Sequence, residues 1–170
     1  MKVDTTLREL IEHQNANPFM GTLLALDPGE TTGYAVFKEH KLTKSGEIKT
    51  KTIETGIVTL QQVLKEYKPD FVVYEHYRVY QHKAKDHAQS DLHTSQFIGA
   101  IKTICLIWGI PYYKQMASIA KGFCTDDKLR DWGLYKRGER HARDAVRHGL
   151  YFLIFNWKKV LKEQEENDKE

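Results

Sequence analysis

The sequence contains Thr22-Leu-Leu-Ala-Leu-Asp27 and, 48 residues later, Asp70-Phe-Val-Val-Tyr-Glu75, two apolar runs that each end in an acid. Apolar residues without polar alternation are typical of strands that are buried on both faces of a sheet. Between the runs, apolar residues at helical spacing predict a helix over 53–67. If the two strands are neighbours, Asp27 and Glu75 lie at the same edge of the sheet.

The rest of the sequence completes a mixed pattern of strands and helices. Turn-forming residues at 28–33 connect the first run to a second predicted strand at 34–37, which makes a hairpin. A more polar third strand is predicted at 44–51. The polar, histidine-rich segment 81–95 is predicted to be a loop or the start of a helix. Further helices are predicted at 4–15, 96–109, 116–121, 126–132 and 138–161, and a short strand at 110–114. This order predicts an α/β fold in which a mixed five-stranded sheet carries helices on both faces.

The charge of the chain is unevenly distributed. The net charge is +3, but the acidic tail at 163–170 holds five acids and one lysine, so residues 1–162 carry 25 Lys and Arg against 18 Asp and Glu. The segment 78–147 has 13 Lys and Arg against 7 Asp and Glu. Such an excess favours a polyanionic partner, although a solvated surface of mixed charge is the alternative.

Cysteine content and hydropathy indicate a cytoplasmic protein. Cys105 and Cys124 are too few for a disulfide scaffold, and no Cys and His spacing matches a zinc site. No apolar run approaches the ~20 residues of a membrane span, and the N-terminus lacks a signal-peptide pattern. We therefore expect free thiols, a reducing compartment and no membrane partner.

The two acids at the strand ends suggest a cation site. Buried carboxylates that lie together repel each other and lose hydration unless protons or cations compensate. A divalent cation between Asp27 and Glu75 removes this conflict, and we expect Gly29 and Gly33 to let the backbone approach a metal or phosphate closely. The alternatives are an Asp-Pro-Gly turn at Asp27 and a solvent-facing strand end at Glu75.

A third cluster lies on the last predicted helix. His141 and Asp144 share one face of this helix, and His148 follows on the same side. Small residues, Ala142, Ala145 and Gly149, are expected to let the helix approach the sheet and the two acids. The alternative is a surface ion pair of Asp144 beside a packed histidine. Arginines at 140, 143 and 147 predict a basic stripe that neutralises phosphates.

These residues resemble a known family. Leu24–Phe37, Val72–Glu75 and His141–Ala145 resemble, in order and spacing, the RuvC family of Holliday-junction resolvases within the RNase H-like superfamily. The segment from Thr125 to His148 resembles the bacteriophage-encoded relatives in particular. The resemblance implies an RNase H-like nuclease domain at 21–162. The helical extension at 1–20 departs from the family, which usually begins almost at its first strand, and the acidic tail follows the domain.

The resemblance also implies a site and a reaction. Asp27, Glu75, His141 and Asp144 correspond to the family's metal ligands, and Lys121 corresponds to its active-site lysine. Two Mg²⁺ or Mn²⁺ ions per site are implied, with hydrolysis of a DNA phosphodiester, and no nucleotide cofactor. Many members carry Asp where His141 stands, and an imidazole ligand suits Mn²⁺ better than Mg²⁺.

The implied substrate is a four-way or otherwise branched DNA junction, nicked on opposing strands by a homodimer whose symmetry matches the junction. The apolar faces of 96–109 and 150–157 are candidate dimer surfaces, with burial in the core as the alternative. By the resemblance, Tyr77 or Tyr80 corresponds to an aromatic residue that the family inserts at the crossover, with ordinary packing as the alternative. The residues expected to contact nucleic acid are Tyr77, Arg78, Tyr80, Lys83, Lys85, Arg140, Arg143 and Arg147.

Parts of the sequence also agree with three other functions. The same fold and acids serve nucleases that act on RNA–DNA hybrids or on flaps. A non-catalytic junction-binding protein would also explain the basic segment. The Asp-Pro-Gly-Glu-Thr-Thr-Gly stretch resembles the phosphate loop of actin-like ATPases too, but that fold needs two such domains and a longer chain.

Overall fold

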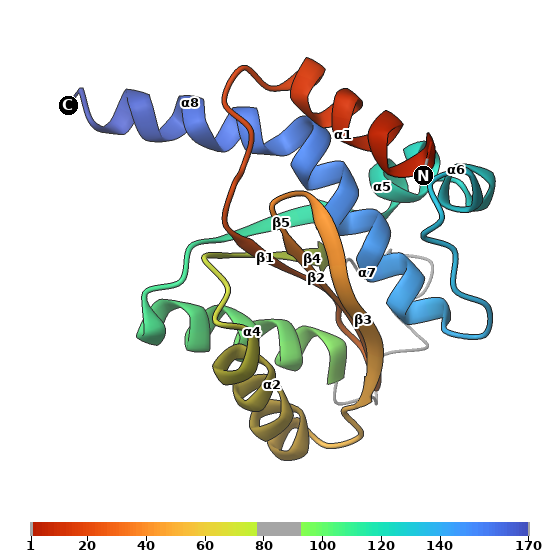
Figure 1. Ribbon diagram of the computed structural model, residues 1–170. Coiled ribbons are helices and arrows are strands. Elements are labelled where there is room, and N and C mark those ends of the chain that lie inside the picture. Colours follow the sequence, from red (N-terminus) through yellow and green to blue (C-terminus); the bar gives the residue numbers. More distant parts are fainter. Residues whose placement is uncertain (1, 78–92, 170) are drawn as a thin grey trace.

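The structure is a computed structural model that describes residues 2–77 and 93–169. Its centre is a five-stranded sheet with the strand order β3-β2-β1-β4-β5 (Figure 1). The strands are β1 (Thr22–Asp27), β2 (Thr31–Lys38), β3 (Lys41–Lys49), β4 (Phe71–His76) and β5 (Tyr112–Met116). Because β1 is antiparallel to β2 and parallel to β4, the prediction of a mixed sheet is confirmed.

The two strands that carry Asp27 and Glu75 are neighbours, which is the condition under which the sequence places both acids at one edge of the sheet. Leu26 pairs with Tyr74, so the next residues, Asp27 and Glu75, lie side by side at one edge of the sheet. Helix α2 (Ile53–Tyr67) makes the crossover that parallel strands require. It begins at Thr52, whose side chain accepts a hydrogen bond from the Thr55 backbone N–H, and this cap stabilises its first turn.

Helices cover both faces of the sheet (Figure 1). On one face, α2 and α4 (His93–Trp108) pack on the apolar side chains of β1 and β4. On the other face, α7 (Arg140–Tyr151) packs on the opposite side chains of the same strands, and α1 (Lys2–Gln14) joins the same apolar core. Burial on both faces explains why the two strands are apolar throughout.

The C-terminal helix is not continuous. The sequence predicts one helix over 138–161, but α7 is followed by a π-helical turn, η2 (Phe152–Asn156), and then by α8 (Trp157–Asn167). The Asn15 side-chain amide donates hydrogen bonds to the carbonyls of Leu153 (3.0 Å) and Ile154 (3.2 Å) in this turn. The N-terminal segment is therefore attached to the helical layer behind the site.

Two short helices and the two candidate dimer surfaces complete the description of the fold. The short helices α5 (Ala117–Phe123) and α6 (Asp126–Asp131) flank α7. Of the two candidate dimer surfaces, 150–157 lies mainly in the core, whereas Leu106 and Ile107 on α4 are exposed. The domain boundaries at 20 and 162 stay predictions. Within residues 2–77 and 93–169, no helix is both long and apolar enough to cross a membrane.

Candidate active site

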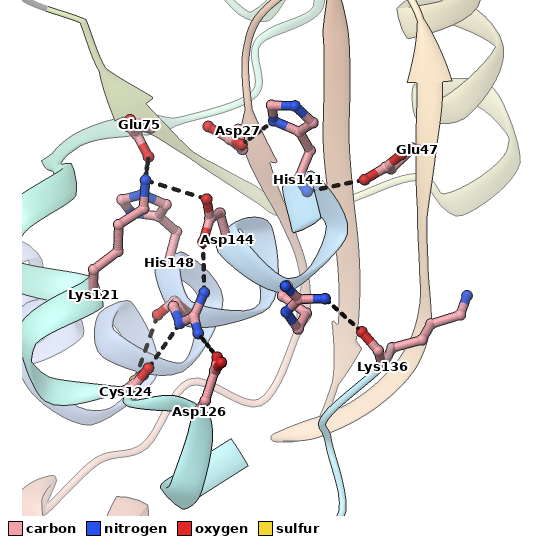
Figure 2. Close-up of polar contacts among 12 residues, drawn as sticks. Asp27, Glu47, Glu75, Lys121, Cys124, Asp126, Lys136, His141, Asp144 and His148 are labelled. Carbon is pink, nitrogen blue, oxygen red and sulfur yellow. Dashed lines mark hydrogen bonds and ion pairs between the residues drawn. The ribbon is translucent and has the colours of Figure 1, made fainter. Parts of the chain in front are cut away.

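Carboxylates from three distant segments face one small region at the edge of the sheet (Figure 2). Asp27 ends β1, Glu75 lies on β4, and Asp144 lies on α7. The Lys121 ammonium nitrogen from α5 lies 3.5 Å from Glu75 Oε2 and 3.2 Å from Asp144 Oδ2. His141 Nδ1 is hydrogen-bonded to Asp27 Oδ2 at 2.9 Å. The five residues that the family resemblance implies as catalytic therefore lie in one cluster.

The electrostatics of this cluster are those of a site with excess negative charge. Burial and the nearby charge of Glu75 raise the pKa of Asp27 from 3.8 to about 6, although the hydrogen bond to His141 opposes the shift. Burial alone would raise the pKa of Glu75, but the contacts of Glu75 with His148 and Lys121 outweigh burial and lower this pKa. Burial would likewise lower the pKa of Lys121, yet its carboxylate neighbours raise it. Additional positive charge near Asp27 would lower its pKa again and favour the ionised carboxylate.

Small residues bring α7 against the sheet. Gly33 of β2 lies under the first turn of α7, where an added Cβ would sit 1.9 Å from the His141 carbonyl oxygen. A Cβ added at Gly149 of α7 would sit 2.2 Å from the Phe37 ring. The expected close approach of α7 is therefore confirmed. The expectation that Gly33 admits a metal or phosphate is wrong, since the backbone of α7 fills this space.

Glu47 on β3 is a part of the site that the sequence does not predict. Its carboxylate accepts a hydrogen bond of 2.9 Å from the backbone N–H of His141 (Figure 2). No side-chain cap is supplied by Glu139, the residue at the N-cap position of α7. Glu47 thus satisfies an unpaired N–H at the helix N-terminus, where a negative charge is also favoured. Since 94 residues separate the partners, no local pattern could indicate this contact.

His148 is the second residue without a predicted role. Its Nε2 lies 2.8 Å from Glu75 Oε2, and its side chain is completely buried. The sequence places His148 on the same helix face as His141 and Asp144, which is the only signal for it. The structure shows that this face supplies partners to two different strand-end acids.

Arg147 has a different environment from the rest of the predicted basic stripe. Its guanidinium nitrogens donate to Asp144 Oδ1 at 2.6 Å, to the Cys124 carbonyl at 2.8 Å and to the Asp126 carboxylate. The side chain of Arg147 is only 11% exposed. These contacts indicate that Arg147 holds Asp144 in place, and they disfavour the predicted contact of Arg147 with a phosphate.

A basic pocket lies beside the acids. It has a volume of about 430 Å³ and is open to solvent. Arg140, which is exposed, and Arg143, which is half-buried, both line it. The full lining is Lys121, Thr125, Asp126, Arg140, Arg143, Asp144 and Arg147. A phosphate next to the carboxylate cluster would meet positive charge here.

Comparisons with known proteins agree with this architecture. No family model and no curated protein matches the sequence. Thermus thermophilus RuvC, solved with a Holliday junction substrate, superposes with a TM-score of 0.60 at 19% identity, over 76% of this chain and 90% of that chain. The chain has the RNase H-like fold of RuvC. The yeast mitochondrial Holliday junction resolvase has a TM-score of 0.57 at 10% identity, covering 98% and 90% of the two chains. Fowlpox virus resolvase, solved with junction DNA, has a TM-score of 0.51 at 15% identity, covering 78% and 96%.

In this RNase H-like fold, the other residues predicted to contact nucleic acid follow β4. Tyr77 is half-buried directly after this strand. Arg78, Tyr80, Lys83 and Lys85 lie outside the described residues. Their predicted contacts with DNA stay predictions.

The donor set of the site suits a divalent cation, but the side chains are paired with each other. Among residues 2–77 and 93–169, no three Asp, Glu, His or Cys side chains lie in an arrangement that is ready to hold a metal ion. The side chains are occupied by one another, because Lys121 bridges Glu75 and Asp144 and His141 is bonded to Asp27. Oxygen ligands of this kind are those that Mg²⁺ and Mn²⁺ prefer. Binding of a cation would require Lys121 to move away from the carboxylates.

Proposed function

We propose that this protein is a divalent-metal-dependent endonuclease that hydrolyses phosphodiester bonds in four-way or other branched DNA junctions. The observation that carries the proposal is the convergence of Asp27, Glu75 and Asp144, with Lys121 between two of them, beside a basic pocket. Two proteins of the same fold were solved with Holliday junction DNA, which supports a junction as the substrate.

The proposed ligands are Asp27, Glu75, His141 and Asp144. Bound Mg²⁺ or Mn²⁺, two ions in the proposed site, would activate a water for in-line attack and stabilise the leaving 3′-oxygen. Lys121, which contacts Glu75 and Asp144 in this structure, would donate hydrogen bonds to the phosphoryl oxygens once cations neutralise these carboxylates. Arg140 and Arg143 would hold the flanking phosphates in the pocket next to Asp144.

Paired nicks would require two sites related by symmetry. We propose a homodimer in which the exposed end of α4, with Leu106, Ile107 and Trp108, contributes to the contact. Exposed apolar side chains that lie together are typical of such surfaces. The predicted cytoplasmic location and bacteriophage origin stay predictions.

A panel of labelled substrates tests the proposal. A four-way junction, a flap, an RNA–DNA hybrid and a linear duplex are incubated with the protein and Mg²⁺, Mn²⁺ or chelator. We expect metal-dependent cleavage of the junction with 5′-phosphate and 3′-hydroxyl products. Preferential cleavage of the hybrid or the flap would assign the other nuclease activity, and junction binding without cleavage would assign a scaffold.

Two variants provide the matched control for this panel. Asp27→Asn and Glu75→Gln keep the size of each side chain and remove its charge, so we expect each to abolish cleavage while junction binding is retained or strengthened. Cleavage at the wild-type rate by either variant would refute the proposed ligand roles.

A further inference from the structure

Three buried polar side chains form a continuous chain behind Glu75. His148, Gln115 and Asn156 are 0%, 3% and 4% exposed. Gln115 Nε2 lies 2.9 Å from His148 Nδ1, and Asn156 Nδ2 lies 2.8 Å from Gln115 Oε1. At the other end, His148 Nε2 lies 2.8 Å from Glu75 Oε2. Because these groups are shielded from solvent, their hydrogen bonds must be matched within the chain itself.

The direction of this chain follows from one additional contact. The Gln115 amide nitrogen also lies 3.1 Å from the backbone carbonyl oxygen of His148. A carbonyl oxygen only accepts, so the group that faces it must be the NH₂ and not the oxygen of the amide. The same NH₂ therefore donates to His148 Nδ1, and Nδ1 carries no proton. Asn156 supports this orientation, because its own NH₂ faces the Gln115 oxygen.

The elements of the fold hold these three hydrogen-bonded side chains in place. Asn156 is the last residue of the π-helical turn η2, and single π-helical turns are frequent at functional sites. Gln115 lies on β5, next to β4, and pairs with Glu75 in the parallel register. Helix α7, strand β5 and the end of η2 thus hold His148, Gln115 and Asn156 in line with Glu75.

We propose that Gln115 and Asn156 hold His148 as the neutral imidazole protonated on Nε2, so that His148 is a fixed hydrogen-bond donor that positions Glu75 for a divalent cation. The part of this inference that concerns the cation rests on the proposed function. A neutral donor orders the carboxylate without adding positive charge beside it, so the carboxylate keeps its attraction for the cation. His148 is in this sense a positioning residue.

The tautomer can be measured without any substrate. Two-bond ¹⁵N–¹H correlation spectra of the ¹⁵N-labelled wild-type protein, recorded in chelator at neutral pH, distinguish the two tautomers and the imidazolium. The signals of His148 are identified by their loss in His148→Gln. We expect an unprotonated Nδ1 and a protonated Nε2. A proton on Nδ1, with or without one on Nε2, would overturn the inference.

Binding of Mn²⁺ alone, followed by calorimetry, tests the positioning role. Loss of an outer partner of a metal ligand typically costs 10–100-fold in affinity, so His148→Leu should weaken Mn²⁺ binding by about 10-fold or more. His148→Gln retains an amide N–H that can reach Glu75 and should keep most of the affinity. Val146→Ala, at a buried apolar residue of the same helix, controls for a general loss of packing, and thermal unfolding verifies that each variant is folded.

Two outcomes separate this inference from the proposed function. Equal weakening by His148→Leu and His148→Gln, or by Val146→Ala, would overturn the positioning role while the metal site stands. Failure of the wild-type protein to bind Mn²⁺ would overturn the proposed function and the cation part of this inference, and the tautomer measurement would still decide the other part.

Discussion

Gly33 lies directly against the backbone of His141, so closely that an added Cβ would be 1.9 Å from the His141 carbonyl oxygen. This contact fixes the height of α7 above β2 and hence the distance from His141 and Asp144 to the strand-end acids. The obstacle is backbone, which cannot rotate away as a flexible side chain would. Gly33 is therefore a residue on which both the fold and the site depend.

Gly33→Ala should lower the free energy of unfolding by about 3 kcal/mol or more, since overpacking against backbone is among the costly substitutions. Urea unfolding measures the change. Gly99→Ala is the matched control, because a Cβ there meets no atom of the described chain within 4 Å. In the middle of α4 this change should raise the free energy of unfolding by roughly 0.5–1 kcal/mol. Equal stability of the two variants would contradict the contact.

Asp27→Asn should stabilise the protein in chelator, and the gain should depend on pH. The pKa of Asp27 is raised from 3.8 to about 6, so its ionised form is penalised in the folded state. This penalty is absent below pH 3.8 and complete above about pH 6. The gain in the free energy of unfolding should therefore be near zero at pH 3 and on the order of 2–3 kcal/mol at pH 8. Unfolding curves of both proteins across this range provide the test, and a gain that shrinks with rising pH would be the wrong sign.

His141→Asp should retain cleavage and shift the metal preference from Mn²⁺ toward Mg²⁺. The change replaces an imidazole with a carboxylate, and Mg²⁺ prefers oxygen ligands more strongly than Mn²⁺ does. The ratio of the junction cleavage rates in Mg²⁺ and in Mn²⁺ should rise several-fold over that of the wild-type protein. An unchanged ratio would argue that His141 does not contact the metal.

Arg147 and Arg140 should respond differently to substitution by alanine. Arg147→Ala leaves the buried Asp144 carboxylate without its 2.6 Å partner, so the free energy of unfolding should fall by about 3 kcal/mol. Arg140→Ala, at an exposed position of the pocket, should leave stability within about 0.5 kcal/mol. It should weaken junction binding and reduce the slope of log affinity against log salt concentration by about one. Thermal unfolding and salt titrations of junction affinity distinguish these effects. An Arg147→Ala variant as stable as the wild-type protein would contradict the role of Arg147 in holding Asp144 and favour the predicted phosphate contact.

Asn15→Ala tests the attachment of the N-terminal segment. The substitution leaves the carbonyls of Leu153 and Ile154 without the donor that Asn15 supplies, so the free energy of unfolding should fall by about 1–3 kcal/mol. Asn17→Ala removes the same side chain from an exposed position nearby, where only the backbone carbonyl accepts a hydrogen bond, and should change stability by less than about 0.5 kcal/mol. Similar losses in the two variants would argue against this role of Asn15.

Much of the fold is local information and was therefore predictable. The run from Thr22 to Asp27 is β1 without correction, and the helix over 53–67 matches α2. Strand β2 begins at Thr31, earlier than predicted, because Thr31 and Thr32 already pair with the end of β3. The π-helical turn was missed, since its supporting hydrogen bonds come from Asn15 at the other end of the chain.

The sequence by itself determined the buried strands and the spacing that places His141 and Asp144 on one helix face, because burial and helical periodicity leave a repeating pattern of apolar residues. Only the tertiary structure decided which partners these residues have. Glu47 on β3 contacts His141 of α7, and Gln115 on β5 contacts His148 of α7, and such contacts leave no periodic trace in the sequence. Burial removes water from these groups at a cost in free energy, and the pairs that offset this cost exist only when the chain has folded.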